Sequence, residues 1–136
     1  MADIYTLIQT ALVNKLLANS SIAAGGGVWE LPAPEDVPYP FYTFFPQSLT
    51  DMNQSPRRGV EALFLVECWS DSLSQVRAGA GYIDTALHDQ ELTISGWSNW
   101  RLTHDSILLL PPEQIAGRLI YRRGGVYRIS IDRNNS

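Results

Sequence analysis

The sequence predicts an α+β domain in which one mostly antiparallel β-sheet carries an N-terminal helix and a central helix on one face. Residues 4–16 and 73–87 repeat apolar side chains at the three- and four-residue spacing of an amphipathic helix. Residues 60–69 alternate in the manner of a strand, and further β-prone segments precede and follow them. A chain of 136 residues fits one domain, residues 1–136, with a core that needs neither disulfides nor a structural metal.

The composition limits the possible functions. The formal net charge is −4, which argues against a dedicated nucleic-acid binder. Charged residues make up 18% of the chain, below the usual share of about 25%, so we expect part of the surface to face a partner. The one cysteine, Cys68, excludes an intramolecular disulfide and a cysteine-based zinc site. The chain lacks a signal-peptide pattern and a membrane-spanning apolar run, so we expect it to stay in a reducing cytoplasm.

The first predicted helix begins after Asp3, whose side chain can cap it, and ends near Asn19. A loop follows from Ser20 and closes with the three glycines at 25–27, where we expect a hinge or tight turn. A phosphate-binding loop is excluded because no Gly-Lys-Ser/Thr follows these glycines.

The next segments alternate between strands and connectors. Residues 28–31 (VWEL) are a short strand, and residues 32–40 (PAPEDVPYP) form an extended surface connector because proline cannot donate to a sheet ladder. Residues 41–45 (FYTFF) are the following strand. Residues 47–58 (QSLTDMNQSPRR) are polar and rich in turn-forming residues, which predicts a mobile loop.

The strand at 60–69 has apolar groups on both faces, which predicts a central position in the sheet. The central helix follows, with Ser72 and Gln75 spaced as a capping box. Gly79 and Gly81 inside this helix each lower the stability of the helix by about 1 kcal/mol relative to alanine. We expect compensation from a close approach of the helix backbone to the flat sheet.

The C-terminal part returns to β structure. Residues 92–94 predict a short strand, and residues 97–109 a longer one that the prolines at 111–112 end. Residues 117–133 predict either two strands around the glycines at 124–125 or one long strand with a glycine bulge there.

Catalytic chemistry is not indicated. His104 with Asp105 lacks a nearby nucleophile, and Glu61 with Glu67, or Asp105 with Glu113, fits plain surface better than an acid–base pair. No spacing typical of a metal, nucleotide or redox site occurs. The sequence therefore predicts no enzyme, no cofactor and no metal.

Arginines are the feature that stands out. Two of them end the polar loop, and Arg118, Arg122, Arg123 and Arg128 lie close together in the terminal β segment. Arginine suits planar, bidentate contacts with carboxylates at interfaces. Because the net charge is −4, carboxylates of an adjacent subunit are favoured over nucleic acid as their partners. The predicted interface residues are Asp51, Arg57, Arg58, Arg118, Arg122, Arg123 and Arg128.

Four motifs follow one another along the chain. They are P-Y-P-F-Y-T-F at 38–44, V-E-C-W-S at 66–70, S-Q-V-R-A-G-A-G-Y-I-D-T-A-L at 74–87, and a closing R-x-S-I-D strand. In this order they resemble the small tail-completion proteins, or tail terminators, of long-tailed bacteriophages. The resemblance covers nearly the whole chain. Its motifs are patterns rather than catalytic signatures, and their order carries it.

The resemblance implies a structural protein without enzymatic activity or cofactor. Its subunits form a ring, commonly six-fold, that caps the head-proximal end of the tail tube and joins the tail to the neck. The implied partners are other copies of the chain, the tail tube protein and a neck or head-completion protein, with genome DNA passing through the ring lumen and no membrane. The implied location is the tail–neck junction of the virion, after assembly in the host bacterial cytoplasm.

Two alternatives remain open at this point. Another neck component, such as a head-closure or stopper protein, is built from similar parts. A nucleic-acid-binding module would lose affinity steeply with salt and on removal of Arg122 and Arg123. By hypothesis, the segment 47–58 reaches into the ring or the tube.

Overall fold

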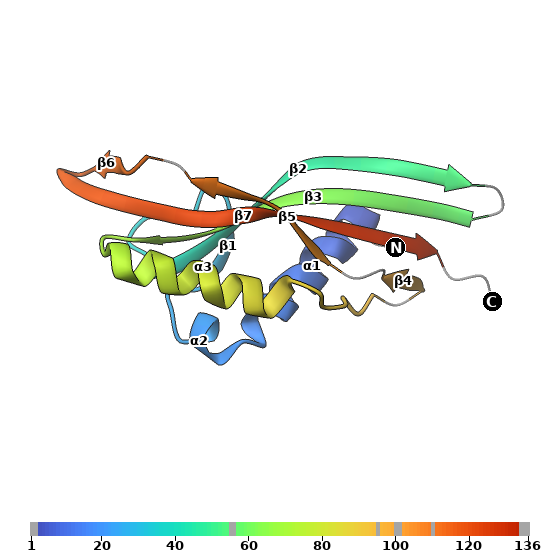
Figure 1. Ribbon diagram of the computed structural model, residues 1–136, viewed down its shortest axis with the longest axis horizontal. Coiled ribbons are helices and arrows are strands. Elements are labelled where there is room, and N and C mark those ends of the chain that lie inside the picture. The colour runs from blue at the N-terminus through green and yellow to red at the C-terminus, as the bar shows by residue number, and fades with distance from the viewer. Residues whose placement is uncertain (1–2, 55–56, 95, 100–101, 110, 134–136) are drawn as a thin grey trace.

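A computed structural model describes residues 3–54, 57–94, 96–99, 102–109 and 111–133. Its helices lie on one side of a mostly antiparallel sheet, which confirms the predicted α+β class (Figure 1). The elements are α1 (Ile4–Leu17), α2 (Ser20–Ala23), β1 (Val28–Glu30), β2 (Phe41–Gln54), β3 (Arg57–Ser70), α3 (Leu73–Leu87), β4 (Trp97–Asn99), β5 (Thr103–Leu109), β6 (Glu113–Ile115) and β7 (Arg118–Arg133).

Strand β3 is central, as its two apolar faces predicted. The sheet order is β1-β2-β3-β7-β4, with β5 and β6 also paired to β7. Every pairing is antiparallel except that of β1 with β2, so the sheet is mixed at this edge. Strands β4, β5 and β6 follow one another along β7, because Trp97 pairs with Arg133, Leu109 with Arg123 and Ile115 with Arg118. The sequence predicted one continuous strand at 97–109, and the structure has two strands there, β4 and β5. Strand β6 continues the same line of pairing along β7.

The hydrophobic core lies between the helices and one face of the sheet. Alternate residues of β3 from Val60 to Cys68 point into this core, whereas those from Glu61 to Trp69 point to the opposite face. Tyr5 of α1 stacks on Phe64 with ring centroids 6.4 Å apart. The helices add buried side chains from α1, α2 and α3: Ile8, Leu12, Leu16, Ile22, Val76, Ile83 and Leu87. We call the opposite face, which faces away from these helices, the outer face.

Helix α3 approaches the sheet closely at one glycine. Its N-cap Ser72 accepts a hydrogen bond from the Gln75 backbone N–H at 3.4 Å, as predicted. The second bond of a capping box is not formed, because the Ser72 N–H donates to Ser70 Oγ and the Gln75 side chain also bonds Ser70. A Cβ on Gly79 would collide with the Sγ of Cys68 and lie 2.7 Å from its Cβ, so the predicted close approach is confirmed there. The prediction was wrong for Gly81, which is exposed and whose Cβ would meet nothing within 4 Å.

The expectation of a loop at 47–58 was wrong. Most of this segment belongs to β2 and β3, which pair from Ser48 with Leu63 to Gln54 with Arg57 and form a long hairpin (Figure 1). The ladder is made by backbone hydrogen bonds, so polar side chains do not prevent it. A register shift between Pro46 and Ser48 accommodates the proline in the strand.

Smaller elements also differ from expectation. Helix α2, capped by Asn19, and strand β6 were not predicted. Residues 92–94 form no strand beyond a single bridge from Ile94 to Trp97. The C-terminal segment is one strand, β7, and its register with β3 runs through the glycines at 124–125 without a bulge.

The glycines at 25–27 form the predicted turn, packed against the proline-rich connector. The Gly26 N–H donates to the Pro40 carbonyl oxygen at 2.7 Å, and a Cβ on Gly26 would collide with the Pro38 carbonyl oxygen. Gly27 has a φ of 105°, a conformation that favours glycine. The turn thus holds the connector near the start of β2.

Candidate subunit interface

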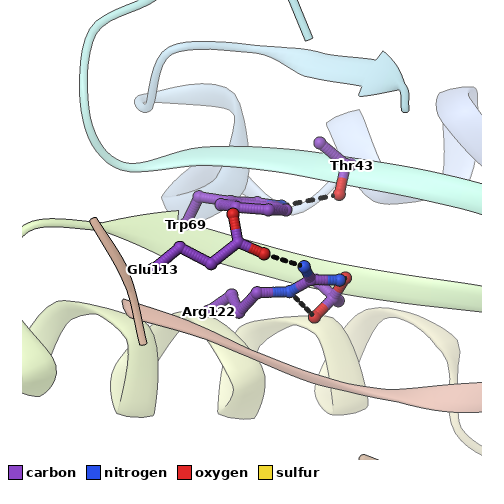
Figure 2. A network of polar contacts seen from close by, with 5 residues as sticks. Thr43, Trp69, Glu113 and Arg122 are labelled. Carbon is purple, nitrogen blue, oxygen red and sulfur yellow. Dashed lines mark hydrogen bonds and ion pairs between the residues drawn. The ribbon is translucent and has the colours of Figure 1, made fainter. Parts of the chain in front are cut away.

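An arginine held by two carboxylates lies on the outer face. Arg122 donates from Nε and Nη2 to the two carboxylate oxygens of Glu67, at 2.9 and 2.7 Å, and from Nη1 to Glu113 at 2.8 Å (Figure 2). The β3–β7 register pairs Arg122 with Trp69 and therefore brings it beside Glu67. The Glu67 side chain is 1% exposed and that of Arg122 14%. Glu67 and Arg122 form a buried, bidentate ion pair.

The charge of Arg122 is maintained in this setting. Burial alone would lower the pKa of Arg122, but hydrogen bonds and charge from Glu67 and Glu113 raise that pKa above its ordinary value. The expectation that Glu67 is plain surface was wrong, because its side chain, on the odd-numbered face of β3, is buried. The two groups are buried as a satisfied pair, which limits the cost of removing them from water.

Aromatic rings continue from this pair toward the connector. The Arg122 guanidinium lies 4.4 Å from the centroid of the Trp69 ring, and Trp69 Nε1 donates to Thr43 Oγ1 at 2.8 Å (Figure 2). Phe41 stacks on Trp69 at 6.0 Å, and Tyr39 stacks on Phe41 at 5.6 Å. We call Tyr39, Phe41 and Trp69 the aromatic ladder.

A cleft of about 620 Å³ opens beside this ladder. One wall is the connector from Leu31 to Tyr39, and the other is the hairpin of β6 and β7. The aromatic ladder contributes to its lining, together with three carboxylates and one arginine. The charged lining residues are Glu35, Asp36, Glu113 and Arg118.

The family model of tail completion protein gp17 matches residues 10–111. This chain belongs to that family. The family confirms the resemblance seen in the sequence. A chain of the solved structure titled "Virion of native gene transfer agent (GTA) particle" has the same fold, with a TM-score of 0.74, 15% identity, and coverage of 97% of this chain and 99% of that chain. A search of curated proteins gave no match.

A second arginine of this tail completion family member repeats the arrangement of Arg122. Arg128 donates from Nη2 to Asp105 at 2.9 Å, and its Nε lies 3.8 Å from Glu61. Arg122 and Arg128 therefore each lie between a carboxylate of β3 and a carboxylate of β6 or β5. Arg128 is 44% exposed, so water screens its ion pairs far more than those of Arg122.

The other predicted interface residues fall in two places. Arg118 is 67% exposed and lies 3.8 Å from Asp71, while Arg123 has no ion pair within the described ranges. Asp51, Arg57 and Arg58 lie near the free end of the β2–β3 hairpin, where the structure describes only their backbone. The sequence analysis expected these arginines to pair with carboxylates of an adjacent subunit. Three of them, Arg118, Arg122 and Arg128, lie close to carboxylates of the same chain instead. An interface role for the seven residues stays a prediction.

His104 and Asp105, which the sequence analysis considered as a catalytic pair, bind different partners in this family member. His104 Nδ1 lies 2.9 Å from Asp84 Oδ1 on α3, whereas Asp105 binds Arg128 on the outer face. Tyr127 stacks on His104 at 4.8 Å and donates to Asp84 at 3.1 Å. Burial and the Asp84 carboxylate raise the pKa of Tyr127. The sequence missed this cluster because its members are far apart in the chain.

Two further features were searched for in the described part of the chain, a cluster of metal ligands and a membrane-spanning helix. Within it, no three His, Cys, Asp or Glu side chains are grouped so as to hold a metal ion. None of its helices combines the length and apolar character needed to cross a membrane.

Proposed function

We propose that this chain is a structural protein of a phage or phage-like virion, that its copies assemble into a ring, and that the ring caps the head-proximal end of the tail tube and joins it to the neck. Membership of the tail completion family over residues 10–111 carries this proposal. The shared fold with a chain from a gene transfer agent virion supports it. The ring is proposed to hold six copies.

The shape of the subunit supports ring formation. A closed ring requires two different surfaces on each subunit, so that one copy binds the next in the same orientation. The end of β2 and the start of β3, which pair at Gln54 and Arg57, lie at one end of the molecule's long axis, and strand β6 lies at the other (Figure 1). The chain therefore offers two separated and chemically different surfaces.

The chemistry of the outer face supports a structural role rather than an enzymatic or nucleic-acid-binding one. Arg122 and Arg128 are engaged by carboxylates of the same chain, so neither is free to bind phosphates. His104 and Asp105 point to different partners, so they form no catalytic pair. The proposed partners are the tail tube protein and a neck protein, with genome DNA passing through the lumen at the tail–neck junction. Assembly is proposed to occur in the host cytoplasm.

The test is polymerisation of the purified tail tube protein with and without this chain. The proposal predicts that negative-stain images show a ring at one end of each tube, and that growth from that end stops. Tubes that grow to the same lengths with bare ends would contradict the tube-capping role. Binding to the isolated neck protein without binding to tubes would instead identify a neck component of the stopper type.

A further inference from the structure

We propose that β2 of one copy of this chain pairs with β5 of the next copy, so that one antiparallel sheet continues across each subunit boundary. The inference rests on the proposed ring and names the contact that joins its subunits. Three observations carry it: two strand edges without a neighbouring strand, the directions of these strands in the sheet, and an exposed aliphatic side chain on each edge.

The first free edge belongs to β2. Strand β1 pairs with β2 only from Tyr42 to Phe44, and among the described residues no other strand pairs with that side of β2. Pro46 has no N–H, so backbone donors on this side begin after it. Residues 47–50 are all exposed, and we call them the β2 edge. Their backbone groups are available to a further strand.

The second free edge belongs to β5, at the opposite border of the sheet. One side of β5 pairs with β7, and within the described ranges no strand pairs with its other side. We call residues 106–109 the β5 edge. Strands β3 and β7 lie between β2 and β5, so the two edges cannot meet within one chain.

The strand directions favour a second copy of this chain as the partner. Each neighbouring pair in the series β2, β3, β7 and β5 is antiparallel, so β2 and β5 run in opposite directions. A copy related by rotation about an axis along the strands keeps these directions. Its β2 therefore lies antiparallel to β5 of the first copy. Each copy offers one edge to either neighbour, which is the head-to-tail contact that a closed ring requires.

An exposed aliphatic residue lies on each edge. Leu49 is 42% exposed and Ile107 is 68% exposed. Leu49 pairs with Ala62 of the core, and Ile107 pairs with Gly125, which itself pairs with Val66 of the core. Both side chains therefore lie on the helix side of the sheet. Placed opposite each other across the subunit boundary, they would cover each other from water.

The backbone orientations of these two residues also match. Backbone groups of Tyr42 and Phe44 hydrogen-bond to the residues that flank β1, so these even-numbered residues of β2 face that side. The register shift after Pro46 reverses the alternation, so the backbone N–H and C=O of Leu49 face the free side. Followed across β3 and β7, the same alternation directs the N–H and C=O of Ile107 away from β7. Leu49 and Ile107 can therefore form a hydrogen-bonded antiparallel pair.

Charge substitution on each edge tests the contact. Leu49→Glu and Ile107→Lys each place an unpaired charge at every junction, so light scattering after size exclusion is expected to show folded monomers under conditions where the wild type forms rings. The double variant is expected to regain rings, because opposite charges then face each other at every junction. Leu17→Glu is the matched control, because Leu17 is 41% exposed and lies on α1, away from both edges. This control is expected to form rings.

A cross-linking experiment measures the distance across the contact. Leu49→Cys with Ile107→Cys in one chain, treated with a short bismaleimide, is expected to give a ladder of covalent multimers. Each single-cysteine variant should stay monomeric, and Leu49→Cys with Ser21→Cys on the exposed side of α2 should give no ladder. The native Cys68 adds little background because it is buried and its thiol has a pKa of about 12.

Hydrogen exchange tests the backbone pairing itself. The amides of Leu49 and Ile107 are expected to exchange rapidly in the monomeric charge variants and slowly in wild-type rings. Rapid exchange of both amides in assembled rings would show that the strands do not pair.

The outcomes separate this contact from the proposed function. Rings from either single charge variant, or no rescue in a folded double variant, would overturn the contact and leave the ring intact. A charge variant that forms rings but no longer binds tube ends would assign that edge to the tube protein, which also overturns the contact. If the wild type forms no ring even on tube ends, the proposed function fails and the contact fails with it.

Discussion

Arg122 and Glu67 lie 55 residues apart in the sequence and form a bidentate ion pair on the outer face of the sheet. The pair joins the two central strands, β3 and β7, beside the cleft. Because Glu67 is almost fully buried, its nearest compensation is the Arg122 guanidinium rather than water.

Arg122→Ala is predicted to lower the free energy of unfolding by about 3–5 kcal/mol, because it leaves the Glu67 carboxylate buried without its partner. Arg122→Lys should lower the free energy of unfolding by less than Arg122→Ala does, because lysine keeps the positive charge. It should still destabilise the protein, because lysine loses the bidentate geometry and the stack on Trp69. Urea denaturation measures both. Arg128→Ala, at the more exposed bridge, is the control and should cost at most about 1 kcal/mol. Equal losses at the two arginines would contradict the assignment of Arg122 as the buried one.

Gly79→Ala is predicted to destabilise the protein by about 1–3 kcal/mol, because the added methyl group collides with Cys68. Gly81→Ala is predicted to act in the opposite direction and to stabilise α3 by up to about 1 kcal/mol, since its Cβ meets open space. Thermal unfolding of the two variants gives the comparison. A stabilised Gly79→Ala variant would show that α3 does not approach the sheet at this point.

Alkaline pH is predicted to weaken the fold through Cys68. Burial raises the pKa of its thiol to about 12, whereas an unfolded thiol ionises near pH 8.5. The unfolded chain therefore releases this proton first, and stability falls as pH rises above about 9, by up to about 1.4 kcal/mol per pH unit.

Urea midpoints from about pH 8.5 to 10 isolate this effect, because tyrosines in the unfolded chain ionise mainly above about pH 10. Cys68→Ala should flatten the fall of stability over this range, whatever its effect on absolute stability. The same slope in Cys68→Ala and wild type would assign the alkaline loss to other groups.

Periodicity predicted the elements that are half-buried. The residues of β3 alternate because helices cover one of its faces, and α3 shows its apolar spacing because one side of it packs on that face. Gly79 was predictable for the same reason, since a glycine in a packed helix indicates a close neighbour. The exposed Gly81 shows that the rule fails where the helix faces water.

The β2–β3 hairpin was not predictable from side-chain pattern. Residues 47–50 are exposed on both faces, so burial imposes no alternation on them. Their strand structure comes from backbone pairing with β3, which is independent of side-chain polarity. The short elements α2 and β6 leave too few residues for any period to appear.

The arginine-rich strand was predictable as a feature, but its partners were not. Which carboxylate faces Arg122 depends on the register of β7 against β3, and no local signal encodes that register. The cleft was hidden for a similar reason, since its walls come from the connector and from the β6–β7 hairpin, which are distant in sequence.

Light scattering after size exclusion, across concentration and with or without the tail tube protein, tests ring formation most directly. The predicted result is one discrete assembly, about 91 kDa for six copies of the 15.2 kDa chain, formed alone or only on tube ends. A mass of 15.2 kDa at every concentration, unchanged by the tube protein, would contradict the ring.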